Sequence, residues 1–185
     1  MKKLIYLFIA TLISFSCTET DLADEGFEFE FLPGYVAFNA PGSSINLDTL
    51  DFMEGESAQD DDPGTADGGV TAVSIENPTG TLSDITVGFE LSGDAVFGTD
   101  YIINNAESAT AGGGSIILDN DVTDVNQFNF VNFEIDFPTD AVTDGEKILV
   151  ITLTSAVNED GETFAVGRGG TETLRSAIIR ISDID

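Results

Sequence analysis

The chain has 185 residues, of which 34 are Asp or Glu and six are Lys or Arg, so its formal net charge is −28. This charge excludes nucleic acids and anionic lipid surfaces as partners, because both would be repelled. It favours a cation or a basic partner, or serves solubility outside the cell. A hydrophobic content of 42%, with 14 Phe, argues against the disorder that often accompanies high charge.

The first 16 residues have the features of a secretory signal. Lys2 and Lys3 form a positive start, the apolar run from Leu4 to Phe15 is too short to span a bilayer, and Cys17 follows. The position of this single cysteine resembles a bacterial lipoprotein signal, in which Cys17 becomes the lipidated first residue. The alternative is an ordinary signal peptide with an incidental cysteine.

Residues 17–26 are predicted to be the lipidated cysteine and a flexible acidic tether. The acids at Glu19, Asp21, Asp24 and Glu25 resemble the short surface-export signal of Bacteroidetes lipoproteins. The resemblance implies a lipid-anchored protein of the outer membrane, displayed at the cell surface. The alternative is a solvated tether that carries no export information.

After the tether, short segments of alternating apolar and polar residues predict β-strands. The predicted strands cover residues 27–31, 35–38, 45–53, 70–76, 85–91, 115–118, 128–137, 147–154 and 177–181. A parity change in 128–137 predicts a bulge near Val131. A long acidic loop is expected at 54–69, and 157–170 is expected to be a long loop or an extended hairpin. No run of ten residues has a helical period, so we predict one all-β sandwich domain over 27–185.

One stretch joins an acidic loop directly to an apolar strand. Asp140, Asp144 and Glu146 precede a strand that is apolar on both faces, with Leu149 and Ile151 on one face and Val150 on the other. Such a strand belongs in the middle of a packed β structure. We therefore expect these carboxylates to be held on a rigid support, as a metal site requires.

Three motifs together resemble the Calx-β family. Residues 97–101 (Phe-Gly-Thr-Asp-Tyr) resemble its Gly-x-Asp-Tyr motif, residues 140–153 its acidic loop and following strand, and residues 179–185 its closing strand and terminal aspartates. The resemblance covers residues from about 45 to 185 and implies an immunoglobulin-like sandwich of two antiparallel sheets. In calcium-binding members, such as the regulatory domains of the sodium–calcium exchanger, calcium lies at one end of the sandwich.

Carried over residue by residue, the resemblance implies a set of seven calcium ligands. These are Glu54, Asp100, Asp140, Asp144, Glu146, Asp183 and Asp185. The chain departs from the fuller pattern at Thr139, Thr143 and Ile184, where the family has acids. We therefore expect at most one or two weakly held calcium ions, and the alternative is an unoccupied acidic rim.

Signals for catalysis are poor. The chain has no His, which excludes His-based triads and imidazole bases, and it has neither a Gly-x-Ser-x-Gly motif nor a phosphate-binding loop. We predict a non-catalytic outer-membrane lipoprotein that serves binding, adhesion or assembly. The alternative is an accessory subunit docked on an outer-membrane complex such as a TonB-dependent transporter, with Phe27, Phe29 and Phe31 as a contact strand. A glycan-degrading enzyme is a third class, without a recognisable site.

Overall fold

The computed structural model describes residues 34–39, 49–58, 73–78, 83–119 and 130–184. All described residues belong to one compact unit, Pro33–Asp185. The predicted signal, Cys17, the tether, the Phe27–Phe31 strand and Asp185 lie outside the described residues. Within the described ranges, no helix is long and apolar enough to cross a bilayer.

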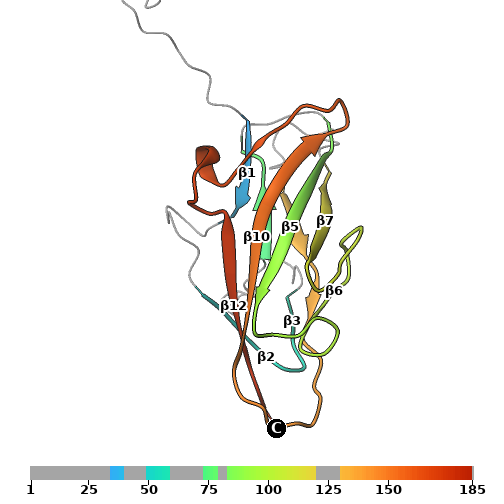
Figure 1. Cartoon of the computed structure of the whole chain (residues 1–185), viewed down its shortest axis with the longest axis vertical. Coiled ribbons are helices and arrows are strands. Elements are labelled where there is room, and N and C mark those ends of the chain that lie inside the picture. Colours follow the sequence, from blue (N-terminus) through green and yellow to red (C-terminus); the bar gives the residue numbers. More distant parts are fainter. Residues whose placement is uncertain (1–33, 40–48, 59–72, 79–82, 120–129, 185) are drawn as a thin grey trace, which may run out of the picture. The chain divides into compact units, whose positions relative to one another are not determined.

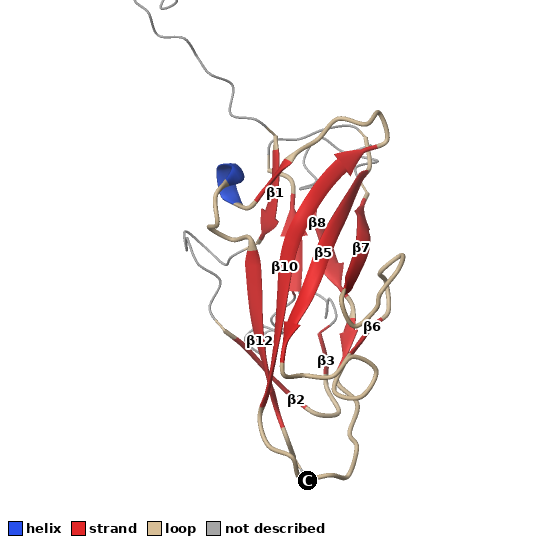
Figure 2. Ribbon diagram, viewed as in Figure 1, coloured by secondary structure: helices blue, strands red, loops and turns tan. Residues whose placement is uncertain are grey.

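Short strands make up most of the described chain, and the helical element among them is a single 3-10 turn (Figures 1 and 2). The elements are β1 (Tyr35–Phe38), β2 (Leu50–Met53), β3 (Ser57–Ala58), β4 (Val73–Glu76), β5 (Ile85–Gly93), β6 (Ile102–Ile103), β7 (Gly113–Leu118), β8 (Phe130–Phe133), β9 (Ile135–Asp136), β10 (Lys147–Asn158), β11 (Ala165–Val166), η2 (Arg168–Gly170) and β12 (Ser176–Ser182). The prediction of an all-β sandwich is confirmed.

The strands form three hydrogen-bonded sheets. Their orders are β2-β12-β10-β5-β7, β11-β1-β4-β8 and the short β3-β9-β6. Most neighbouring pairs are antiparallel, whereas β2 runs parallel to β12 and β1 runs parallel to β11. The apolar strand predicted from residue 147 is β10, and it occupies the middle of the five-stranded sheet.

The side chains of β10 explain its central place. Leu149, Ile151 and Leu153 are completely buried on its inner face, while Ile148 and Val150 are half-buried on its outer face. It pairs with β12 from Lys147 to Thr152 and with β5 from Leu149 to Asn158, where a bulge interrupts the register between Leu153 and Ser155. The acidic loop that carries Asp140, Asp144 and Glu146 therefore leads directly into a well-buried central strand.

Aromatic contacts join the layers of the core. Phe89 on β5 meets Phe133 on β8 edge to face, with ring centroids 5.2 Å apart. Phe52 on β2 stacks on Phe137, which follows β9, at 4.8 Å. Buried aromatic pairs add favourable energy beyond their burial, so these contacts fix the spacing of the sheets.

Some strand boundaries differ from the sequence predictions. The ladder between β4 and β8 runs without interruption from Phe130 to Phe133, so no bulge occurs at Val131, and Phe130 is exposed instead. The strand is interrupted at Glu134. Beyond it, β9 no longer belongs to the sheet of β8 and pairs with β3 and β6 instead. β10 extends four residues beyond the predicted Thr154, because β5 continues to supply pairing partners.

Interlocking hydrogen bonds connect the start of β10 to the end of β5. The carbonyl of Ile148 accepts the N–H groups of Asp94 and Ala95, at 3.0 and 3.1 Å. The Asp94 carboxylate in return accepts the N–H of Ile148 at 2.6 Å. Gly93 permits this close approach, because its φ is +112° and a Cβ there would overlap the Ile148 carbonyl. The loops that leave β5 and enter β10 are thereby held together.

Candidate metal site

Asp100 lies in the connection between β5 and β6, where contacts within the protein hold its side chain in place. Only 6% of the residue is exposed. Its carboxylate accepts the N–H of Val96, and its own N–H donates to the Val96 carbonyl at 2.9 Å. The neighbouring Tyr101 packs edge to face on Phe97, which anchors the loop to the core.

Asp140 and Asp144 lie in the loop that joins β9 to β10. The Asp140 carboxylate accepts the N–H of Val142 at 2.8 Å, which closes a local turn. Ala141, between them, has a φ of +64°, so the loop reverses sharply at this point. Gly145 follows with a φ of +85° and lets the chain enter β10.

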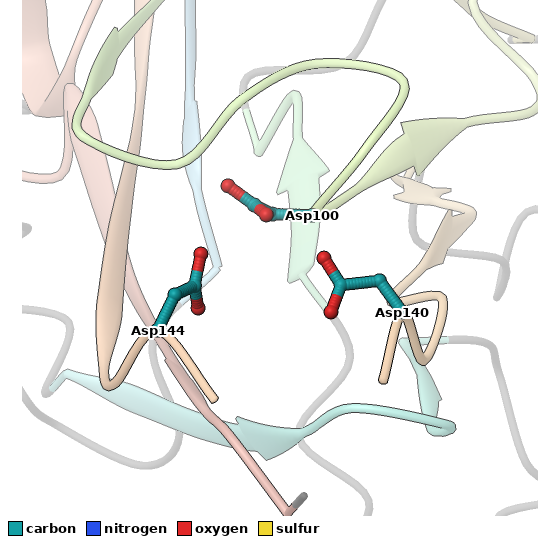
Figure 3. Close-up of side chains that lie close together, drawn as sticks. All are labelled: Asp100, Asp140 and Asp144. Carbon is teal, nitrogen blue, oxygen red and sulfur yellow. The ribbon is translucent and has the colours of Figure 1, made fainter. Parts of the chain in front are cut away.

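The three aspartates come together at one end of the sandwich. One carboxylate oxygen from each of Asp100, Asp140 and Asp144 lies within 4.8 Å of those of the other two. The carboxylates point toward one another, and they come from two loops that are 40 residues apart in sequence (Figure 3). Three negative charges at this separation repel, and a cation between them would relieve the repulsion.

A cation from the chain itself already contacts this cluster. The Lys147 ammonium lies 3.0 Å from an oxygen of Asp144. Its hydrogen bond to Asp144, and beyond that the charges of Asp144, Asp100 and Asp94, raise the pKa of Lys147, although burial acts in the opposite direction. Lys147 therefore serves as a partial counter-ion for the acidic cluster.

The other predicted ligands occupy different positions. One oxygen of Asp183 accepts the N–H groups of Asp144 and Gly145, at 2.8 and 2.9 Å, so this side chain holds the acidic loop. Glu146 forms an ion pair with Arg180 at 3.4 Å. Glu54 is buried, and its carboxylate is not part of the three-aspartate cluster. Asp185 lies outside the described residues.

Lys147 and Asp94 were not predicted to belong to the site. The spacing of Asp144 and Lys147 could have suggested an ion pair, since they are three residues apart in an acidic loop. Little in the sequence placed Asp94 near the cluster. Its carboxylate accepts the N–H of Ile148 only because β5 pairs with β10, and these strands are distant in sequence.

The donor set suits a hard cation. All three side chains offer carboxylate oxygens, which are the ligands that calcium prefers, and calcium takes six to eight oxygens in flexible geometry. The cluster supplies three, so further oxygens would come from second carboxylate oxygens, loop carbonyls or water. The described residues thus form a partial site that could hold a metal ion.

Comparisons with known proteins identify the fold. No family model and no curated protein sequence matches the chain. Among solved structures, the apo-form CBD1 domain of Calx is similar over 83% of this chain and 99% of that domain, with 17% identity and a TM-score of 0.50. The CBD2 domain of Calx matches over 80% of this chain and 86% of that chain, with 10% identity and a TM-score of 0.47. The CBD12 structure from CALX1.2 matches over 80% of this chain and 45% of that chain, with 15% identity and a TM-score of 0.44.

The similarity to CBD1 confirms that the chain has a Calx-type β-sandwich fold. It covers nearly all of that domain, so the fold is matched as a whole.

Proposed function

We propose that this protein is a non-catalytic binding module whose Calx-type sandwich holds calcium between its loops, and that Cys17 anchors it by lipid to the outer membrane. The observation that carries the calcium proposal is the convergence of Asp100, Asp140 and Asp144 from two loops. The resemblance of the Gly-x-Asp-Tyr and acidic-loop motifs to calcium-binding Calx-β domains supports it. The role of the bound ion would be to stabilise the loop end of the sandwich.

The chemistry of the chain favours calcium over other metals. Zinc and copper sites in proteins are built mainly from His and Cys, and this chain has no His and a single Cys. Magnesium demands near-ideal octahedral geometry, whereas carboxylates on two separate loops suit the variable geometry of calcium.

The residues of the site have different tasks in this proposal. Asp100 is buried and held by Val96, so it provides a fixed ligand. Asp140 and Asp144 reach solvent from the β9–β10 loop, and Asp183 holds the backbone of that loop. Lys147 must release Asp144 for both oxygens of that carboxylate to bind an ion, so it competes with calcium.

The membrane anchor is supported by the sequence alone. Lys2, Lys3, the apolar run from Leu4 to Phe15 and Cys17 are arranged as in lipoprotein signals. Incorporation of a labelled fatty acid that is lost in Cys17→Ser would support the anchor, and labelling that persists in the variant would contradict it.

Calcium titration calorimetry tests the site. The wild-type protein is compared with Asp140→Asn/Asp144→Asn, and with Glu159→Gln as a control that removes an acidic charge far from the cluster. Glu159 is exposed and follows the far end of β10, about 40 Å along the strand from the cluster. We expect heat from binding in the wild type and in Glu159→Gln but not in the double variant. Absence of binding to the wild type at millimolar calcium would overturn the proposal.

A further inference from the structure

Exposed aliphatic side chains gather at the end of the sandwich that carries the aspartate cluster. Among the large apolar residues that the structure describes, Val96, Val142 and Ile184 are the most exposed, each at 55%. Two residues follow at 50%, Met53 at the end of β2 and Phe130 at the start of β8. The surface at this end of the sandwich comprises Val96, Val142, Ile184 and Met53. Each belongs to a different chain segment, yet all four segments meet at this end. Exposed apolar groups that gather in one region commonly mark an interaction surface.

The aspartate cluster, the hydrogen bonds of Asp183 and the pairing of β2 with β12 bring these segments together. Val96 donates its N–H to Asp100, and Val142 donates its N–H to Asp140, so both aliphatic residues adjoin the cluster. Ile184 follows Asp183, which accepts hydrogen bonds from the acidic loop. Met53 ends β2, where it pairs in register with Ser182 of β12. Figure 1 shows the β9–β10 loop and the end of β12 together at the lower end of the sandwich.

The charge of this end is strongly negative. Its acids include Asp51, Asp94, Asp140, Asp144, Glu146 and Asp183. The two cations among the described residues of this end, Lys147 and Arg180, are both engaged in ion pairs with acids. A surface that combines net negative charge with exposed aliphatic groups is complementary to one that combines basic and aliphatic groups.

We propose that this end of the sandwich is a docking surface for a basic, amphipathic segment of a protein partner. The aliphatic side chains of Met53, Val96, Val142 and Ile184 would contact the apolar face of the segment, and the surrounding carboxylates would pair with its Lys and Arg side chains. A membrane surface rich in anionic lipid is disfavoured, because its charge has the same sign as this end.

This inference goes beyond the proposed calcium site and does not require it. Calcium and a basic segment would draw on the same carboxylates, so a bound ion reduces the charge available to the partner. We therefore expect calcium to weaken docking. Only this second expectation rests on the proposed function.

The test uses a fluorescent amphipathic peptide made of leucine and lysine, whose binding is followed by anisotropy in chelator at physiological salt. The wild-type protein is compared with Val96→Ser/Val142→Ser/Ile184→Ser. The control is Ile117→Ser/Ile178→Ser, which removes exposed aliphatic groups from β7 and β12. We expect the triple variant to bind at least about tenfold more weakly, since it removes apolar area that docking would bury. The control should bind as the wild type does.

The outcomes separate this proposal from simple charge attraction and from membrane binding. Unchanged affinity in the triple variant would reduce the interaction to charge and overturn the docking surface. An equal loss in the control would show that exposed aliphatic groups contribute wherever they lie, which would also overturn it. The single variant Val142→Ser repeats the test if the triple variant unfolds. Binding to phosphatidylglycerol vesicles in calcium that is stronger than binding to the peptide would assign this end to a membrane instead. Because the main comparison is made in chelator, a failure of calcium binding leaves its result intact.

Discussion

Replacing Asp100 by Asn should have opposite effects on stability with and without calcium. The amide oxygen of Asn can still accept the N–H of Val96, so the loop keeps its internal hydrogen bond. The negative charge is lost, which removes the repulsion between position 100 and the carboxylates of Asp140 and Asp144. In chelator the variant should therefore be more stable than the wild type, although it has lost one of the carboxylates proposed to bind calcium.

The size of the effect follows from the geometry of the cluster. Two unit charges 4.8 Å apart interact by about 1 kcal/mol in a water-like medium, and Asp100 has two such neighbours. The attraction of Lys147 to Asp100 offsets part of this repulsion. A net gain of about 1 kcal/mol corresponds to a rise in Tm of about 2–4 °C for a domain of this size. If the wild type binds calcium as proposed, calcium at about 100 times its Kd should add about 2.7 kcal/mol.

Thermal unfolding in chelator and in calcium measures both effects in one experiment. We expect Asp100→Asn to melt above the wild type in chelator and to lose the calcium-dependent rise of about 5–10 °C that the wild type shows. A lower Tm in chelator would show that the carboxylate at position 100 is structurally required. A calcium-dependent rise that survives in the variant would show that Asp100 is not a ligand.

Three further predictions follow from described contacts. Lys147→Met should tighten calcium binding, measured by calorimetry, because the ammonium no longer competes for Asp144; unchanged affinity would refute the competition. Glu76→Gln should raise the Tm at neutral pH, because burial raises the pKa of Glu76 and so penalises its charged form, while Arg168 opposes this more weakly. The difference from wild type should vanish as the pH falls below the ordinary value of 4.5, where the carboxyl is protonated in both states. Gly93→Ala should destabilise far more than Gly98→Ala in denaturant unfolding, because a Cβ at position 93 meets the adjacent strand, whereas at position 98 it meets nothing and costs about 1 kcal/mol of backbone strain; equal losses would contradict this.

The fold could be predicted because its main signals are local. The alternation of Ile85, Val87 and Phe89 marks β5, and the doubly apolar run around Leu149 and Ile151 marks a central strand. Burial then follows from the two-residue period of a strand. The break between β8 and β9 was missed, because it depends on which neighbour each half pairs with, and pairing partners are distant in sequence.

The candidate site was only partly accessible from the sequence. The motifs placed Asp100, Asp140 and Asp144 on loops that could meet, and the structure brings their carboxylates together. The motifs could not show that Glu146 contacts Arg180. That contact arises because β10 and β12 pair with Ile148 opposite Arg180, which is a property of register. Side-chain partners on neighbouring strands are set by such long-range alignment rather than by local spacing.

The parallel pairing of β2 with β12 has a mechanical consequence. Leu50 to Met53 lie beside Ile179 to Ser182 in one uninterrupted register. Suppose that the chain is pulled at the start of β2 and at the end of β12. Because the two strands are parallel, they are then pulled in opposite directions along their shared axis. The hydrogen bonds between them are then loaded together in shear, instead of being peeled apart one after another. A sandwich joined in this way is suited to resist force applied along the chain.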